Sequence, residues 1–198
     1  SGDVGPKGAP ILKDAVGFHQ ADFVVMESTY GDRSHDTTPE TFAQELNDAI
    51  ARGGTILIPA FAVDRTEVIL MALKELILEK KIPALPIYVD SPMALAALNF
   101  YREAVAAKSP EIRAGVSERF ANQDPFDAGL LHQMATTEES KAINDVTGPA
   151  IIISASGMAT GGRVVHHLEN MLPHSEHAVI LIGYQAEGTR GRALVEGA

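Results

Sequence analysis

The sequence contains no cysteine among its 198 residues. This absence excludes disulfide bonds, thiol nucleophiles and thiolate zinc sites, and it removes the usual redox indication of compartment. Any metal ion bound by this chain must therefore be held by histidine and carboxylate side chains.

Long apolar runs are also missing. No run approaches the roughly 18 apolar residues that a membrane-spanning helix needs. The first residues, Ser1-Gly-Asp-Val4, lack the basic-then-apolar pattern of a secretion signal. We therefore expect a cytoplasmic protein without a membrane partner, and the sequence leaves its oligomeric state open.

Positive charge is scarce, because 16 Lys and Arg residues stand against 26 Asp and Glu residues, for a formal net charge of −10. Nonspecific binding to a polyanion depends on many cations that displace counterions from phosphates. A nucleic acid would therefore have to bind a local basic patch. An acidic surface is more often just solubilising, so the charge supports no positive conclusion.

Two common catalytic patterns are absent. The histidines are scattered without ligand spacing, and the adjacent pair His166-His167 points roughly 100° apart on a helix. No Gly-x-Ser-x-Gly occurs, so the nucleophile elbow of a serine hydrolase is missing. We expect each histidine to be solvated or satisfied within the core.

What is present is an alternation of apolar runs and helical patterns, in a chain that is 45% hydrophobic and 21% charged. Such a chain is long enough for one compact α/β domain. The predicted strands are 23–26, 55–58, 87–89, 150–153 and 178–182. We expect a mainly parallel, Rossmann-like sheet flanked by helices, with a helical insertion around 92–146 outside the sheet.

Capping signals mark two helix starts. Thr38 can cap a helix whose first turn accommodates Pro39. Asp64 followed three residues later by Glu67 is a capping-box pattern, which predicts a second helix that reaches about Lys81.

Four predicted strands end in polar or Gly-rich loops: 27–31, 59–65, 154–163 and 183–192. The carboxyl ends of parallel strands open on one edge of a sheet, so these loops should meet in one crevice. Their free amides and arginines would make an anion site there. Tight packing explains most single Gly-rich turns, and the loop at 154–163 has neither the Walker nor the dinucleotide spacing.

Glu27 ends the first of these runs and would project into the same crevice. A simpler interpretation is that Glu27 caps the next element or pairs with a surface cation. The chemistry of the residues leaves both interpretations open.

Taken together, the motifs resemble the β-CASP group of the metallo-β-lactamase superfamily. They are Glu27-Ser-Thr-Tyr-Gly-Asp-Arg-Ser-His35, Pro59-Ala-Phe-Ala-Val-Asp-Arg-Thr-Glu67, Ser154-Ala-Ser-Gly-Met-Ala-Thr-Gly-Gly-Arg163 and Gly183-Tyr-Gln-Ala-Glu-Gly-Thr-Arg-Gly-Arg192. The group includes the nuclease subunit of the eukaryotic pre-mRNA 3′-end cleavage factor, and the pattern here is most similar to prokaryotic RNA-processing nucleases.

The resemblance implies a lactamase fold with two zinc ions, whose cleft is covered by a β-CASP domain that binds single-stranded RNA. It implies that Asp3 is a zinc ligand and that Glu27 orients a catalytic histidine. Such a carboxylate fixes the imidazole tautomer and raises its basicity.

The resemblance also implies that other zinc-binding motifs of the family are missing from this chain. We therefore expect an excised fragment, with residues 1–22 as a lactamase remnant and 23–198 as the β-CASP domain. A single carboxylate cannot hold zinc, so we expect the fragment to bind no zinc and to be inactive.

Backbone phosphate contacts are predicted from the crevice geometry rather than from the family. The predicted residues are Arg65, Ser154, Ser156, Gly157, Arg163, Gln185, Thr189 and Arg190. Two other functions stay open, namely a non-catalytic module that binds RNA or protein, and a doubly wound nucleotide-binding domain.

Overall fold

The computed structural model describes residues 7–17, 20–29, 31, 38–121 and 123–197. Its strands form one five-stranded sheet in the order β3-β2-β4-β1-β5, and every pairing is parallel. The strands are β1 (Ile56–Pro59), β2 (Ile87–Asp90), β3 (Leu131–Gln133), β4 (Ile151–Ser154) and β5 (Ala178–Val179). The predicted α/β class with a parallel sheet is confirmed.

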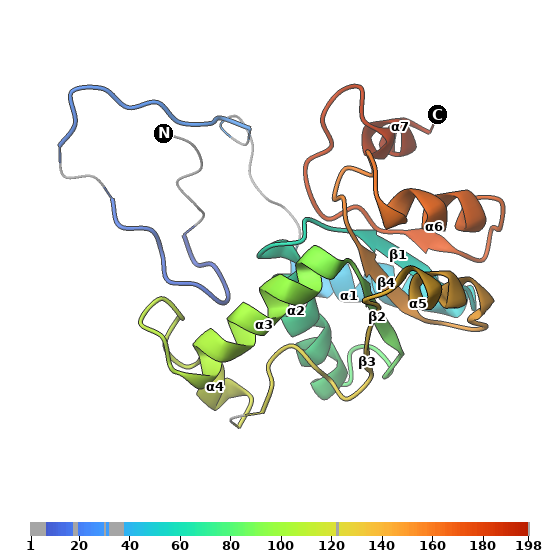
Figure 1. Cartoon of the computed structure of the whole chain (residues 1–198), viewed down its shortest axis with the longest axis horizontal. Helices are drawn as coiled ribbons and strands as arrows, with labels where there is room; N and C mark the ends of the chain where they lie inside the picture. The colour runs from blue at the N-terminus through green and yellow to red at the C-terminus, as the bar shows by residue number, and fades with distance from the viewer. Residues whose placement is uncertain (1–6, 18–19, 30, 32–37, 122, 198) are drawn as a thin grey trace.

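Helices cover both faces of this sheet (Figure 1). They are α1 (Pro39–Ala51), α2 (Arg65–Leu78), α3 (Pro92–Ala106), α4 (Val116–Arg119), α5 (Thr137–Ala142) with the 3₁₀ turn η1 (Ile143–Asp145), α6 (Arg163–Met171) and α7 (Arg190–Glu196). None of the helices in the described ranges is long and apolar enough to cross a membrane.

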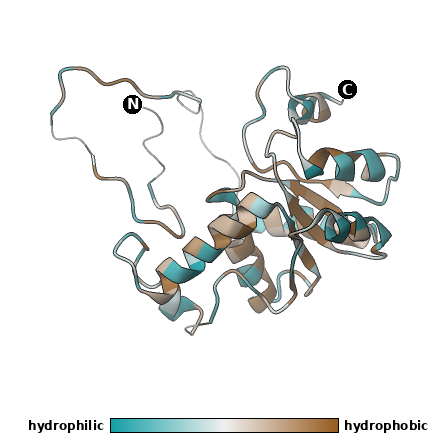
Figure 2. Cartoon of the chain, in the orientation of Figure 1, coloured by the Kyte–Doolittle hydropathy of each residue, from teal (hydrophilic) through white to brown (hydrophobic). Residues whose placement is uncertain are grey.

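The side chains of β1 divide the core into two apolar layers. Ile56 and Ile58 are buried with residues of α1, α2 and α3. Leu57 points to the opposite face, where it is buried with residues of η1 and α6. Because successive side chains of a strand alternate between faces, a strand covered on both sides is apolar throughout. The central strands are accordingly hydrophobic along their length (Figure 2).

Four of the five predicted strands are present in the sheet, but the predicted strand at 23–26 is not. Residues 23–26 form no strand, and Phe23 and Val25 are 93% and 72% exposed. An apolar run becomes a strand only when a neighbouring strand satisfies its backbone hydrogen bonds. No described residue pairs with this run, which lies outside the α/β body (Figure 1).

Leu131–Gln133 takes the place at the sheet edge, within the region predicted to be helical and outside the sheet. Its three residues carry almost no strand signal. Strand β2 decides the outcome, because it pairs with β3 in register and its Tyr88 stacks on His132 at 4.8 Å between ring centroids. The rest of the 92–146 region does contain α3, α4, α5 and η1, as predicted.

The two predicted helix caps differ in outcome. Thr38 accepts a hydrogen bond from the backbone N–H of Thr41, as predicted for the start of α1. The prediction of a capping box at α2 is wrong, because Asp64 has φ +64° and its side chain forms no capping hydrogen bond. Asp64 instead accepts a 2.9 Å hydrogen bond from Tyr101. Glu67 is fully buried, and this burial raises its pKa to about 7.

Gly54→Ala is expected to lower the free energy of unfolding by about 1–3 kcal/mol, the usual cost of overpacking. A Cβ at Gly54 would collide with the Glu176 carbonyl and lie 2.8 Å from the His177 nitrogen. This backbone leads directly into β5, so it cannot move without disturbing the sheet. Urea unfolding followed by circular dichroism measures the change.

Gly161→Ala is the matched control, because nothing lies within 4 Å of a Cβ placed there. We expect it to change stability by less than about 0.5 kcal/mol. Equal unfolding midpoints for the two variants would contradict the close packing at Gly54.

Candidate nucleic-acid interface

Four separate segments of the chain meet at a cavity of about 330 Å³ beyond the carboxyl end of β1. Each of the four predicted loops contributes to its wall. The lining residues are Glu27, Thr29, Pro59, Ala60, Phe61, Arg65, Gly157, Met158, Ile182, Gly183 and Tyr184. The predicted convergence of these loops is therefore present, although the first loop does not follow a strand.

Glu27 supplies a negative charge to this cavity. Its Oε2 atom accepts a 2.7 Å hydrogen bond from the backbone N–H of Thr29. Hydrogen bonds from the side chain and then the backbone of Thr29 hold the pKa of Glu27 below its usual value. The carboxylate is therefore ionised at neutral pH and oriented by its own turn.

Arg65 supplies a positive charge to the same cavity. It is the first residue of α2 and is exposed. Among the described residues, none forms a hydrogen bond or an ion pair with its guanidinium group. An unpaired guanidinium in a concave site is suited to bind a phosphate group through its fork of N–H donors.

A buried polar cluster outside this cavity is centred on Asp90, the last residue of β2. Asp90 is fully buried, and its Oδ2 atom lies 2.6 Å from the Ser140 hydroxyl and 2.7 Å from His167 Nε2. Its Oδ1 atom accepts a 2.7 Å hydrogen bond from Arg163. Arg163 also donates to the Met134 carbonyl at 2.8 Å. The cluster joins β2 to α5 and α6.

Asp90 was missed at the level of sequence. The signal that singled out Glu27, an acidic residue at the end of an apolar strand, also occurs in Ile87-Tyr-Val-Asp90. Its burial and its partners could not be seen, because His167 lies 77 residues away along the chain.

The fold and the four-loop cavity agree with a match to a known family. A sequence model of the Beta-Casp domain matches residues 66–194, which is most of the chain. This chain belongs to the β-CASP family. The matched region begins in the first turn of α2 and ends in α7, so it contains two of the four cavity-forming segments, 154–163 and 183–192.

Curated proteins are similar along nearly all of this β-CASP chain. "Ribonuclease TTHA0252" of Thermus thermophilus is 37% identical over 198 residues, covering 98% of this chain and 45% of the relative. "Transcription termination factor FttA" of Pyrococcus abyssi is 34% identical, covering 91% of this chain and 28% of the relative. An "RNase J-like protein" of Methanocaldococcus jannaschii is 34% identical, covering 90% and 41%. The chain thus spans less than half the length of these relatives.

The remaining predicted phosphate contacts occupy two kinds of position in the β-CASP domain. Gly157 lies on the cavity wall. The others form hydrogen bonds within the chain: Ser154 with the Asp90 carbonyl, Ser156 with Thr160, Arg163 with Asp90, Gln185 with the carbonyls of Gly157 and Gly183, Thr189 with the Ala186 carbonyl, and Arg190 with the Ala159 carbonyl. These bonds hold the loops against one another. Their contact with phosphates stays a prediction.

The predicted zinc ligand Asp3 lies outside the described residues. Within the described ranges, no group of three or more histidine, aspartate or glutamate side chains could hold a metal ion. The cavity contributes the single carboxylate of Glu27 to such a set, whereas a protein zinc site takes three or four ligands. The described residues therefore do not fit a zinc ion by themselves.

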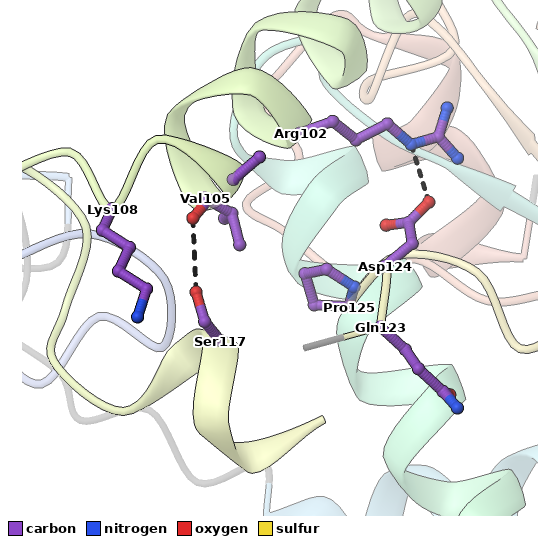
Figure 3. Close-up of a pocket in the computed structure, with 8 residues that line it drawn as sticks. Arg102, Val105, Lys108, Ser117, Gln123, Asp124 and Pro125 are labelled. Carbon is purple, nitrogen blue, oxygen red and sulfur yellow. Dashed lines mark hydrogen bonds and ion pairs between the residues drawn. The ribbon is translucent and has the colours of Figure 1, made fainter. Parts of the chain in front are cut away.

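A larger cavity of about 460 Å³ lies away from the four loops, between α3 and α4 (Figure 3). Arg102 on its wall already pairs with Asp124 at 2.7 Å, and the Ser117 hydroxyl donates to the Val105 carbonyl at 3.3 Å. Arg102, Asp124 and Ser117 therefore serve the local fold. The smaller four-loop cavity is the better candidate site, because its exposed Arg65 has no hydrogen-bond or ion-pair partner among the described residues.

Proposed function

We propose that this chain is the β-CASP domain of a zinc-dependent RNA hydrolase of the metallo-β-lactamase fold. In this proposal it forms the lid that binds single-stranded RNA over the cleft where phosphodiester bonds are hydrolysed. The observation that carries the proposal is the meeting of four polar loops at one cavity, where Arg65 has no partner among the residues that the structure describes. Relatives named ribonuclease and RNase J-like support RNA as the substrate.

The two charges of the cavity have different proposed roles. Arg65 binds a backbone phosphate and so positions the strand. Glu27 is a fixed, ionised carboxylate that orients a histidine of the proposed parent protein. The two zinc ions of that parent would be held by residues beyond those described, with Asp3 among their ligands. We assign no step of hydrolysis to the described residues.

The division of the chain into a lactamase segment and a β-CASP domain also stays a prediction. Residues 1–22 are proposed to belong to the lactamase fold, and residues 23–198 to the β-CASP domain. Among the described residues up to 31, Ile11 is the one that packs fully into the core, where Leu12 bridges to Ile112 beside it. The isolated chain is expected to cleave no RNA.

Arg65→Ala tests the proposed interface. It is expected to weaken binding of a single-stranded oligoribonucleotide and to reduce the slope of log affinity against log salt by about 0.7–1, because one phosphate contact is lost. Fluorescence anisotropy over a range of salt concentrations measures both quantities.

Arg192→Ala removes the same charge at a control position. Arg192 lies on α7, where its guanidinium pairs with Glu196 at 2.6 Å, and it does not line the cavity. We expect its salt slope to match that of the unmodified chain. Equal losses in both variants would mean that only net charge matters, and the proposed interface would be rejected.

A further inference from the structure

Phe61 is an aromatic residue that the fold leaves half exposed at the candidate site. Its side chain is 50% exposed, whereas the core residue Phe126 is 1% exposed. Phe61 follows β1 and lines the four-loop cavity together with Arg65. Single exposed apolar residues are common on protein surfaces and need no explanation by themselves. Phe61 differs from such residues because it shares its cavity with Arg65, a cation that has no partner among the described residues.

The backbone of Phe61 is held in place on both sides. Its carbonyl accepts a 2.9 Å hydrogen bond from the Thr66 hydroxyl, and Thr66 is buried in the first turn of α2. The preceding residue Ala60 donates its N–H to the Ser154 carbonyl at 3.0 Å. The backbone that carries the ring is therefore fixed, so a ligand that packs against the ring would have to restrict only the side-chain rotations of Phe61.

Gly157 supports the ring from the neighbouring loop. A Cβ at Gly157 would lie 3.1 Å from Cδ2 of Phe61 and 3.0 Å from its backbone nitrogen, so the absence of a side chain lets the two loops approach this closely. One edge of the ring is thus backed by protein. Among the described residues, no aromatic ring stacks on the rest of it.

We propose that Phe61 is a stacking platform for one unpaired nucleobase of the RNA strand. An aromatic ring beside a cation is the arrangement by which proteins bind single strands, because the ring stacks on a base while the cation holds the phosphate. Every base has a π-face, so the contact tolerates any sequence. It excludes duplex RNA, whose bases are already stacked on one another. This inference rests on the proposed function and adds base recognition to it.

Two probes separate stacking from phosphate binding. One is a short oligoadenylate, and the other is an abasic oligoribonucleotide of equal length, which has the same backbone but no base. Phe61→Ala is expected to weaken binding of the oligoadenylate by roughly 5- to 100-fold. It should leave binding of the abasic strand unchanged. Arg65→Ala should weaken binding of both strands.

Phe100 provides the matched control. It is 71% exposed on α3 and does not line the cavity. Phe100→Ala should therefore leave the affinity for both probes unchanged. Circular dichroism of each variant confirms that its helices and sheet are intact before affinities are compared.

A second readout requires no loss of affinity. The chain contains no tryptophan, so Phe61→Trp introduces a single indole fluorophore that keeps the stacking surface. Oligoadenylate should quench its fluorescence, whereas the abasic strand should not. Phe100→Trp should show no quenching with either strand.

The outcomes distinguish this inference from the proposed function. Loss of oligoadenylate affinity in Phe61→Ala together with quenching in Phe61→Trp supports both. If oligoadenylate binds and depends on Arg65, but Phe61→Ala binds as tightly as the unmodified chain and Phe61→Trp is not quenched, stacking is refuted and the RNA interface survives. If neither strand binds to the unmodified chain, the proposed function fails and the stacking role fails with it.

Discussion

Asp90→Ala is expected to lower the free energy of unfolding by about 3–5 kcal/mol, the range found when one partner of a buried ion pair is removed. The substitution leaves Arg163, which is 21% exposed, without its carboxylate. It also removes the acceptor of the Ser140 hydroxyl and the partner of the buried His167. All three groups lose a hydrogen bond, and two of them, Ser140 and His167, are buried, which is why the loss should exceed that of a single bond.

Chemical unfolding in urea measures this loss. Asp145→Ala is the control, because Asp145 is an exposed carboxylate in η1, close in sequence to Ser140. We expect the control to change stability by no more than about 0.5 kcal/mol. Similar unfolding midpoints for Asp90→Ala and the unmodified chain would show that the cluster adds nothing to stability.

The Asp90 cluster also predicts an acid dependence of stability. Burial by itself would raise the pKa of Asp90, but hydrogen bonds from His167, Ser140 and Arg163 outweigh it and hold the pKa below its usual value. A carboxyl group with a lowered pKa in the folded state stabilises the fold above its unfolded pKa, and this stability is lost as the pH falls through the folded value. Asp90→Asn should therefore flatten the decline of stability on the acid side of the unfolded aspartate pKa, near 4.

Glu27→Gln in the proposed full-length parent is expected to lower the rate of RNA cleavage by roughly 10- to 100-fold, the usual loss when a carboxylate that orients an active-site histidine is removed. Glutamine keeps the size of the side chain and an acceptor for the Thr29 N–H, which now bonds to Glu27 at 2.7 Å. It removes the negative charge that stabilises a protonated imidazole. Single-turnover cleavage measures the rate.

Zinc content and RNA affinity of the same variant decide the interpretation. Both should stay close to those of the unmodified protein, because Glu27 is not proposed to bind either one. Arg65→Ala should show the opposite pattern, with weaker RNA binding and less effect on the rate at saturating RNA. An unchanged cleavage rate in Glu27→Gln would return Glu27 to a structural role at the turn before α1.

The helix caps show how far local chemistry predicts this structure. Thr38 caps α1 as its sequence indicates, because the cap needs only groups three residues apart. The same kind of signal in Thr136-Thr-Glu-Glu139 was overlooked, and there the reciprocal capping box does form. Asp64 and Glu67 have the capping-box pattern but do not form the capping box. Asp64 instead accepts a hydrogen bond from Tyr101, and Glu67 is buried in the core. Tertiary contacts can override a local signal.

The candidate site was predicted in outline and not in detail. Glu27, Arg65 and Gly157 line the cavity in which the loops were expected to meet. Arg163 was expected beside them and is held by Asp90. Loop positions follow from the rule that parallel strands end at one edge, whereas the partner of each side chain depends on residues far away in the sequence.

By itself, the sequence determined the parallel α/β class and the meeting of loops at one edge. Runs such as Ile151–Ile153 are apolar at every residue, which is typical of a parallel strand whose two faces are both covered by helices. Only the tertiary structure decided that 131–133 is a strand and 23–26 is not, and that Asp90 joins β2 to α5 and α6. The reason is physical, because hydrophobicity is a property of each side chain, whereas strand pairing and buried ion pairs need partners that only the folded chain brings within reach.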